Sequence, residues 1–337
     1  MMSENSENKG ADRPRVSIGY ETPDLARDQI RFAVTLPTFR RPEHLHKTLV
    51  SLQHQKFPHP FAIVVMENDT GGMEGAEVAQ RFFEERKTPG LVVLAHDRGN
   101  CHAYNAGWNT VLETFPNVEA IAVIDDDEVA GPDWLSSMER TMTDTGADIV
   151  GGPQRPVFSD KNLDRWMAHP VFKPAYKTTG AVPILYSSGN VMIARKVLDA
   201  MPQPFLDPLF NFIGGGDADF YSRCRAVGFK FAWCEDAPVF EPVPDSRTEP
   251  VWLGKRSRRE GAISAMLETR RNPGAAGRLV SFLKSVALLG VSPFRMARLW
   301  RKTGSATMGM HHPNVAFGRF IAVFGSINEQ YRTQDGS

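Results

Sequence analysis

Short aliphatic segments alternate with stretches of helical periodicity over the first 150 residues of the chain. The four aliphatic segments are IRFAVTLP (30–37), FAIVVMEN (61–68), LVVLA (91–95) and EAIAVID (119–125). Apolar residues recur at helical spacing in residues 42–55, around 78–83, in 103–115 and in 131–142. Strand–helix alternation of this kind is typical of a parallel sheet covered by helices on both faces. We therefore expect an α/β fold.

Polar loops follow three of these aliphatic segments. PTFRRP (37–42) follows the first, ENDTGG (67–72) the second, and four consecutive acidic residues (125–128) the fourth. Ligands of open α/β sheets bind outside the carboxyl ends of the strands, so these loops are expected to share one ligand-binding edge. Closely spaced Asp side chains are typical ligands of Mg²⁺ or Mn²⁺. The alternative is an acidic loop leading into a helix N-terminus, where carboxylates are favourable.

A second acidic cluster lies in FIGGGDADFYSRCRAVGFKFAW (212–233). Three glycines precede Asp217, and glycine lets a backbone approach a ligand closely. The helical periodicity that follows places Asp217 at the start of a helix. A carboxylate there is a candidate general base, provided that its surroundings bring its pKa into a useful range. The alternative is a structural helix cap.

Several functional classes are disfavoured by what the sequence lacks. There is no G-x-x-x-x-G-K-[ST] motif, and no G-x-G-x-x-G follows the first aliphatic segment, which argues against P-loop nucleotidases and nicotinamide dehydrogenases. The 3 cysteines are odd in number and show no C-x-x-C spacing, which disfavours a disulfide framework and a zinc site. A formal net charge of zero gives no reason to expect nucleic acid as a partner.

The C-terminal residues 271–337 are basic. They contain nine Lys or Arg against two acidic residues, a net charge of +7, so residues 1–270 carry −7. Two apolar stretches lie within this part, LVSFLKSVALLGV (279–291) and VAFGRFIAVFG (315–325). We expect an amphipathic extension that associates peripherally with a membrane surface, because anionic lipids attract nearby Lys and Arg. The alternative is a helical pair packed on the catalytic domain or on a second subunit.

The expected location is cytoplasmic, at the inner face of the cytoplasmic membrane. The polar N-terminus lacks the apolar core of a secretory signal. No segment reaches the roughly 18 uninterrupted apolar residues that would span a bilayer, and the 279–291 stretch is too short to do so.

Five segments, in this order, resemble the family 2 glycosyltransferases, inverting enzymes of the GT-A fold, and within them the succinoglycan-type exopolysaccharide transferases. They are TLPTFRRPEHLHKTLVSL, IVVMENDTGG, GNCHAYNAGWNTV, IDDDE (the family's D-x-D) and GGGDADFYSRCRAVGFK. The resemblance covers roughly residues 30–265. It implies a Rossmann-like, mostly parallel sheet flanked by helices, with a C-terminal helical extension. The expected divisions are a flexible segment (1–28), a catalytic domain (29–268, with a nucleotide half 29–150 and an acceptor half 151–268) and the basic extension (269–337).

The resemblance also implies roles for individual residues. Contacts with the nucleotide, its ribose or the donor sugar are expected from Pro37, Thr38, Arg40, Glu67, Asn105, Asp125 and Asp126. Asp127, together with Asp125, would bind Mg²⁺ or Mn²⁺ on the diphosphate. Asp217 would deprotonate the acceptor hydroxyl for in-line attack on the anomeric carbon, which inverts its configuration in one displacement.

Three positions depart from the family pattern. Tyr104 stands where the A-R-N segment has Arg, so that contact is missing or is supplied by Arg98. Gly216 replaces the Glu that precedes the catalytic Asp, and Glu241 lies where a metal-assisting His is common.

A basic segment, WLGKRSRREG (252–261), follows. Its Arg256 and Arg259 are candidates for contacts with the acceptor or the diphosphate, because a guanidinium suits phosphate oxygens; the alternative is a solvated basic face.

The sequence therefore predicts an inverting glycosyltransferase. It would move a sugar from a nucleotide-sugar, with UDP the preferred nucleotide, to a polysaccharide or lipid-linked saccharide acceptor. Two alternatives stay open. One is a nucleotidyltransferase, which also places acidic residues at the edge of an α/β sheet. The other is a catalytically silent nucleotide-sugar-binding subunit of a polysaccharide assembly complex.

Overall fold

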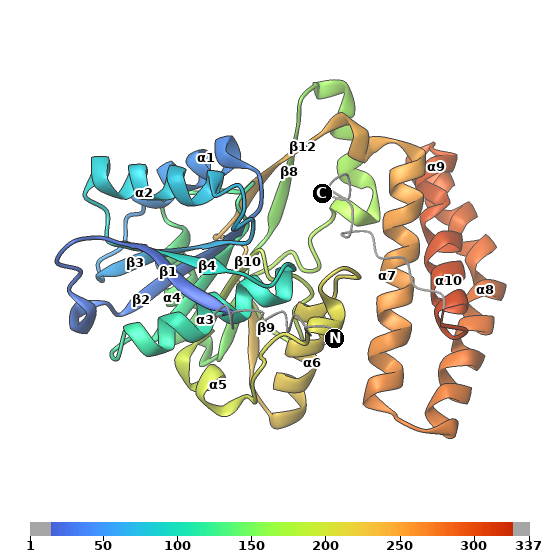
Figure 1. Ribbon diagram of the computed structural model, residues 1–337. Helices are drawn as coiled ribbons and strands as arrows, with labels where there is room; N and C mark the ends of the chain where they lie inside the picture. Colours follow the sequence, from blue (N-terminus) through green and yellow to red (C-terminus); the bar gives the residue numbers. More distant parts are fainter. Residues whose placement is uncertain (1–14, 326–337) are drawn as a thin grey trace, which may run out of the picture.

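The computed structural model describes residues 15–325 and contains one large mixed sheet flanked by helices (Figure 1). The order of the nine strands across this sheet is β1 (Val16–Glu21), β4 (Gly90–Ala95), β3 (Phe61–Glu67), β2 (Phe32–Thr38), β5 (Ala120–Ile124), β10 (Asn190–Ala194), β7 (Ile149–Gly151), β11 (Phe231–Trp233) and β9 (Gly180–Val182). The α/β class is confirmed.

The four strands expected from the sequence form the parallel part of the sheet. β2 pairs in parallel with β3 and with β5, and β3 pairs in parallel with β4. Their carboxyl ends therefore meet at one edge, as predicted. Beyond β5 the sheet is mixed, because β10 runs antiparallel to both β5 and β7. The start of β10 lies beside the end of β5, with Asn190 opposite Ile124.

Helices cover both faces of the sheet (Figure 1). α1 (Pro42–Gln53), α2 (Glu74–Arg86) and α4 (Trp134–Thr145) contribute to one hydrophobic core, and α3 (Asn100–Thr114), α5 (Arg195–Ala200) and α6 (Gly216–Val227) to the other. Apolar residues three and four positions apart form each inward face; α1, for example, buries Leu45, Leu49 and Leu52. The cysteines at 101, 224 and 234 are buried and free.

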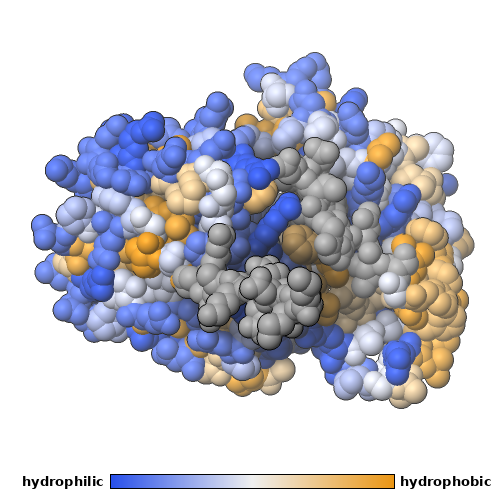
Figure 2. Space-filling view, in the orientation of Figure 1, coloured by the Kyte–Doolittle hydropathy of each residue, from blue (hydrophilic) through white to orange (hydrophobic). Residues whose placement is uncertain are grey.

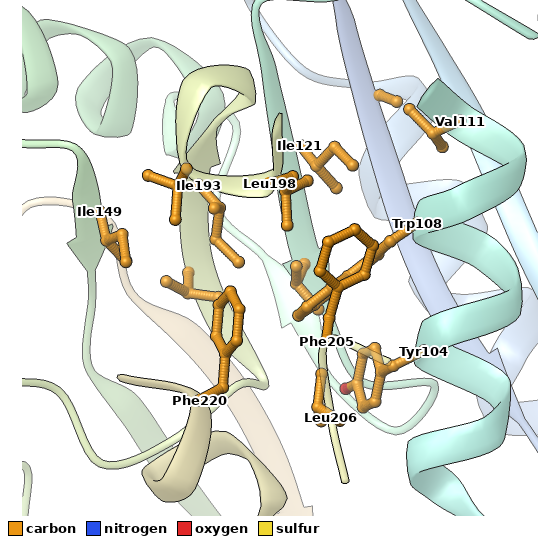
Figure 3. Close-up of a cluster of buried hydrophobic side chains, with 14 of the residues drawn as sticks. Tyr104, Trp108, Val111, Ile121, Ile149, Ile193, Leu198, Phe205, Leu206 and Phe220 are labelled. Atoms are coloured by element: carbon orange, nitrogen blue, oxygen red, sulfur yellow. The ribbon is translucent and has the colours of Figure 1, made fainter. Parts of the chain in front are cut away.

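An aromatic cluster attaches α6 to α3 (Figure 3). The Trp108 ring of α3 lies 5.9 Å from that of Phe205 and 5.6 Å from that of Phe220 on α6, centroid to centroid. The Trp108 indole N–H donates to the Thr35 hydroxyl on β2. Because all three rings are buried, this packing fixes the start of α6 near the carboxyl ends of the parallel strands.

A second, three-stranded sheet borders the same edge. Its order is β6 (Val129–Ala130), β12 (Val239–Val243) and β8 (Gln154–Phe158). β6 follows the acidic loop directly, and β12 carries Glu241. Short 3₁₀ helices connect these parts: η1 (Arg27–Gln29), η2 (Lys161–Ala168), η3 (Pro170–Phe172), η4 (Pro208–Phe210) and η5 (Asp245–Thr248).

The C-terminal extension is helical, as expected, and lies beside the α/β domain (Figure 1). It begins earlier than the expected residue 269, because α7 (Pro250–Arg271) packs against α10 (His311–Ala322); its other helices are α8 (Ala275–Thr303) and α9 (Ala306–Gly309). α7 and α10 cross at two glycines: a Cβ at Gly261 would lie 2.0 Å from the Val315 carbonyl oxygen, and one at Gly318 would lie 1.9 Å from the Arg258 oxygen. Only glycine permits this close approach.

Three expectations about the termini need correction. Residues 16–21, expected within a flexible segment, form β1, which pairs with β4; residues 1–14 lie outside the described part of the chain. α7 continues past the expected boundary at residue 268 to Arg271. The apolar stretch 279–291 is part of a 29-residue helix, α8, which runs through Pro293. By length and composition alone, α8 is long and apolar enough to cross a membrane.

Asn190 joins four segments of the fold through its buried side chain. Its amide oxygen accepts from the Trp134 indole N–H at 2.8 Å, and its amide nitrogen donates to the carbonyls of Pro153 and Ala237 at 3.1 and 2.9 Å. These bonds hold α4 and the entries to β8 and β12 around the start of β10. A buried group that loses its partner costs about 1–3 kcal/mol.

We predict that Asn190→Ala lowers the free energy of unfolding by about 2–3 kcal/mol, because it removes the partner of the Trp134 indole N–H and of the Ala237 carbonyl, whereas the Pro153 carbonyl keeps its bond from the Val239 N–H. Urea denaturation monitored by tryptophan fluorescence measures this change. Asn117→Ala is the matched control: Asn117 is exposed and makes a single bond to the Asp28 carbonyl, so its loss should cost less than about 0.5 kcal/mol. Equal effects of the two substitutions would contradict the role given to Asn190.

Candidate functional site

The four acidic residues after β5 form the loop between β5 and β6, and three of them are deeply enclosed. Burial, followed by the neighbouring charge of Asp127, raises the pKa of Asp125 and of Asp126 to about 7. Burial also raises the pKa of Glu128 well above its usual range, and Asp125 adds to this. The carboxylates of this loop are therefore costly to ionise together, and a bound cation would favour their ionised forms.

Asp125 lies at the centre of the site. The Tyr104 hydroxyl donates to its Oδ1 at 2.7 Å. Gly189, just before β10, leaves room for its other oxygen, since a Cβ at that position would lie 2.6 Å from Oδ2. Tyr104, which replaces the Arg of the family pattern, therefore orients the carboxylate that the sequence assigned to the ribose or sugar.

Asp126 is directed into the protein. It accepts a hydrogen bond from the Thr38 hydroxyl at 2.8 Å, and the Arg41 guanidinium lies 3.5 Å away. Thr38 is itself buried, so this bond joins the end of β2 to the acidic loop. The structure thus brings Thr38 and Asp126 together in an internal bond, and their expected contacts with the nucleotide stay predictions.

Asp127 faces two guanidinium groups that the sequence analysis did not identify as part of the site. Arg41 Nη1 lies 2.6 Å from Asp127 Oδ2, and Arg247 Nη2 lies 4.0 Å from the same oxygen. Arg247 also donates to Glu241 Oε1 at 2.5 Å. Arg41 adjoins the predicted Arg40 in PTFRRP, so the sequence does contain a signal for its position near the acidic loop. Arg247 belongs to no motif, and only the three-dimensional structure shows that it lies near Asp127.

The donor atoms fit a divalent cation. Burial is the main cause of the raised pKa of Asp125 and of Glu241, and the Asp127 charge is the second cause for both, so the three carboxylates lie close together. Carboxylate oxygens are the ligands that Mg²⁺ and Mn²⁺ prefer. Within residues 15–325 no group of three His, Cys, Asp or Glu side chains forms a metal site by itself. Any cation here would complete its shell with substrate oxygens or water.

Asp217 occupies the first turn of α6, after Gly214 and Gly215, whose φ angles of 81° and 95° suit glycine. Its carboxylate accepts from the Ala218 backbone N–H at 2.7 Å. Burial raises the pKa of Asp217, while hydrogen bonds and the nearby Arg256 charge oppose the rise. The Ser188 backbone hydrogen-bonds to Asp217, and Gly189 borders Oδ2 of Asp125, so both carboxylates lie near one short segment before β10.

Gly216 is required by packing. A Cβ at this position would lie 2.8 Å from Sγ of Cys101, a distance that real Cβ atoms do not adopt. The Glu of the family pattern therefore has no room here, because Cys101 at the start of α3 fills the space.

Two expected nucleotide contacts have other partners in the structure. Glu67 is fully buried and accepts from the backbone N–H groups of Asp69 and Ala76 at 2.7 and 3.0 Å. Both amide atoms of Asn105 bond to the backbone of Leu206, at 2.7 and 2.9 Å. These groups hold loops in place, and their contacts with a nucleotide stay predictions.

Arg40 lies at the mouth of the site. It forms an ion pair with Asp69, and its guanidinium stands 5.1 Å from the Phe39 ring centroid. Arg98 stands at the same distance from that ring, so both cations reach the region after β2 and β3. Pro37 lies half-buried in β2, opposite Met66.

The basic segment of α7 divides into two faces. Lys255 and Arg258 are exposed, as expected from the alternative interpretation of this segment as a solvated basic face. Arg256 is half-buried and near enough to Asp217 and Glu241 to lower the pKa of each. Arg259 is buried, at 7% exposure, and is not part of the solvated face.

The contact between Gly216 and Cys101 gives a stability prediction. Gly216→Ala should lower the free energy of unfolding by about 1–2 kcal/mol, because the new methyl group meets Sγ, and Cys101→Ala in the same chain should abolish this loss. A double-mutant cycle in urea measures the coupling. Gly290→Ala, in open space on α8, is the control and should be neutral or stabilising by up to about 1 kcal/mol. Additivity of the two changes would contradict the predicted clash.

Comparisons with known proteins identify the fold and the family of the chain. The succinoglycan biosynthesis protein ExoM of Rhizobium meliloti (strain 1021) is 28% identical over 259 residues, which are 74% of this chain and 79% of that protein. Among solved structures, the mannosyltransferase PcManGT of Pyrobaculum calidifontis, in complex with GDP-Man and Mn²⁺, superposes with a TM-score of 0.52 at 17% identity and covers 87% of this chain and 89% of its own.

S. aureus TarS (residues 1–349), in complex with UDP, superposes with a TM-score of 0.50 at 13% identity, covering 88% of this chain and 92% of its own. These likenesses confirm the GT-A fold. The model of the family "Glycosyl transferase family 2" matches residues 33–201, which contain every strand of the parallel part of the sheet and the whole acidic loop. This chain belongs to glycosyl transferase family 2.

Proposed function

We propose that this glycosyltransferase moves a sugar from a nucleotide-sugar, with UDP as the nucleotide, to a saccharide acceptor with inversion at the anomeric carbon. One observation carries the proposal: the carboxylates of Asp125, in the acidic loop, and of Asp217, at the start of α6, both lie beside the short segment Ser188–Gly189 that leads into β10. The acidic loop suits the diphosphate end of a donor, and Asp217 suits the acceptor end. The nucleotidyltransferase alternative is set aside because the chain belongs to glycosyl transferase family 2.

Asp217 would act as the general base. Burial raises its pKa, which makes the carboxylate a better proton acceptor than an exposed Asp. It would take the proton of an acceptor hydroxyl as that oxygen forms its bond to the anomeric carbon. The bond between this carbon and the diphosphate oxygen breaks in the same displacement, and the nucleoside diphosphate leaves with the bonding electrons.

The acidic loop would hold the donor. Asp125 and Asp127, with Glu241 beside them, would bind a Mg²⁺ or Mn²⁺ ion, which neutralises negative charge on the departing diphosphate when it is bound. Arg41 and Arg247 already face Asp127, so both are placed to contact phosphate oxygens once a cation takes their place on the carboxylate. Tyr104 keeps Asp125 oriented toward the donor.

The acceptor is proposed to be a growing polysaccharide or a lipid-linked saccharide at the inner face of the cytoplasmic membrane. The printed name of the 28% identical relative places that protein in succinoglycan biosynthesis, which is consistent with an exopolysaccharide acceptor for this chain. The exposed apolar side chains of α8 and the basic charge of residues 271–337 support peripheral membrane association.

A second candidate is a catalytically silent nucleotide-sugar-binding subunit. The observation that favours it is Gly216, where the family pattern has a Glu next to the base and where Cys101 leaves no room for one. The two candidates differ in whether Asp217 takes a proton from an acceptor hydroxyl: it does so in a transferase and does not in a silent binding subunit.

We predict that Asp217→Asn lowers kcat for sugar transfer by at least about 100-fold, because general-base catalysis contributes a factor of about 10²–10⁴. Binding of UDP should change less than about twofold, as measured by calorimetry. The control is Asp236→Asn, an exposed Asp in the turn before β12. Transfer by wild type must be shown first, with UDP-sugars screened against saccharide acceptors; full activity of Asp217→Asn would overturn the assignment of the base.

The same role predicts a pH dependence. The base acts only when ionised, and burial raises the pKa of Asp217, so kcat/KM should fall as the pH drops through a value above the ordinary Asp range of about 4. The acidic limb should be absent from the residual activity of Asp217→Asn. A limb that survives this substitution would assign the titration to another group.

The metal assignment gives a binding prediction. Calorimetric titration of UDP into wild type should show at least about tenfold tighter binding with Mn²⁺ than without, and Asp127→Asn should remove that gain because a cation ligand is lost. Asp144→Asn, on α4 away from the site, is the control with the same change in charge. Equal UDP affinity with and without Mn²⁺ in wild type would contradict a metal–diphosphate site.

A further inference from the structure

A basic cavity lies within the C-terminal extension, apart from the donor site. Its volume is about 580 Å³, and residues of α7, α8 and α10 line it. Its charged lining consists of Arg271, Lys284, Arg295, Arg319 and a single acid, Glu268. Four cations against one carboxylate give the cavity a net positive charge, which suits an anionic ligand.

Arg319 supplies an unused donor in this cavity. Its side chain is buried, and two of its nitrogens are held by Glu268 and by the Ser264 hydroxyl. Its Nε is also buried but has no hydrogen-bond partner. Glu268 is shared with Lys284, so this one carboxylate already serves two cations. A buried N–H without a partner is unfavourable, and an anionic oxygen in the cavity would satisfy it.

One wall of the cavity is apolar and continues onto the surface. Leu288 and Val291 of α8 line the cavity, and Val291 is also 46% exposed. The exposed side chains that continue this surface along α8 are Leu279, Val280, Leu283, Val286 and Phe294, the last at 77% exposure. Figure 2 shows a hydrophobic area over the extension at the right of the molecule. An anion site next to an exposed apolar surface matches an amphiphile better than a fully polar ligand.

We propose that this cavity binds the phosphate headgroup of an anionic membrane phospholipid, with the exposed face of α8 entering the acyl region at the interface. The proposal rests on the peripheral membrane association proposed above. It adds a site through which that association would depend on the phospholipid headgroup. Basic residues and apolar side chains together are the pattern by which a helix binds an anionic membrane surface.

The arrangement of α8 favours binding in the interface over crossing the bilayer. Its buried side carries serines, Ser281, Ser285 and Ser292, which pack within the extension. Lys284 and Arg295 lie near the middle of the helix and line the basic cavity. A spanning helix would carry these charges into the hydrocarbon region, whereas an interfacial helix keeps them at headgroup depth.

The test is flotation of the full chain with vesicles of phosphatidylcholine alone or mixed with phosphatidylglycerol. Wild type should bind the mixed vesicles, and alkaline carbonate should release it. Arg271→Gln/Arg295→Gln, which removes two cavity cations, should weaken binding at least about fivefold more than Arg298→Gln/Arg301→Gln, which removes two charges of the same helical extension outside the cavity lining. Equal losses in the two double variants would overturn the cavity as the headgroup site.

Two further arms identify the ligand and the role of the apolar face. Calorimetry should detect binding of soluble short-chain phosphatidylglycerol but not of inorganic phosphate, and the cavity variant should lose it; equal binding of inorganic phosphate would overturn the lipid assignment. Leu283→Glu/Phe294→Glu should abolish flotation, whereas Val227→Glu, an equally exposed change on α6, should not. Carbonate-resistant binding, or a dimer that dissociates in the Leu283→Glu/Phe294→Glu variant, would also contradict interfacial docking.

These outcomes stay separate from those for sugar transfer. Wild type that binds UDP but no vesicle would end both the membrane association and the headgroup site, and it would leave the glycosyltransferase assignment intact. Vesicle binding without UDP binding would support the headgroup site and contradict the proposed use of a UDP-sugar.

Discussion

The repulsion among the buried carboxylates after β5 is the constraint around which the rest of the site is arranged. Five acidic side chains, Asp125, Asp126, Asp127, Glu128 and Glu241, lie close together, and burial makes each charge costly. Hydrogen bonds from Thr38, Tyr104 and Gln154 and the cations Arg41 and Arg247 offset part of that cost. The part of the carboxylate charge that these groups do not offset attracts further positive charge. A metal ion accompanied by a diphosphate brings both the cation and the groups that the arginines would then contact.

The two halves of the domain meet where this charge is concentrated. β5 ends at the acidic loop, and β10, its antiparallel neighbour, begins beside that end. Asn190 at the start of β10 fixes α4 and the second sheet, and the second sheet contributes Glu241. The aromatic packing of Trp108 fixes the start of α6 and therefore Asp217. A strand junction and an aromatic cluster thus set the separation between the acidic loop and Asp217.

The sequence predicted the parallel strands and their shared edge because both depend on local periodicity and on chain order. It also singled out Asp217, which directly follows a glycine-rich signal, and the acidic run after the fourth aliphatic segment, whereas the separate roles of Asp125 and Asp127 were implied by the resemblance to the family. It did not indicate which polar groups would be used internally. Glu67 and Asn105 bond to the backbone of other loops, and Arg247 approaches Asp127 from a distant turn; these partners are set by tertiary structure. The length of α8 was underestimated because Pro293 and scattered charges interrupt a run of apolar letters without ending the helix.

The glycine contacts between α7 and α10 have a mechanical consequence. Backbone lies directly against backbone at Gly261 and Gly318, so these two helices have little freedom to slide or tilt independently. α7 carries Arg256 next to Asp217, while α10 packs along α8. The extension is therefore a rigid element and not a flexible linker. If α8 binds a membrane surface, the rigid extension would fix the angle and height of the proposed acceptor end of the site above that surface. This geometry would decide which hydroxyl of a membrane-bound saccharide can reach the site.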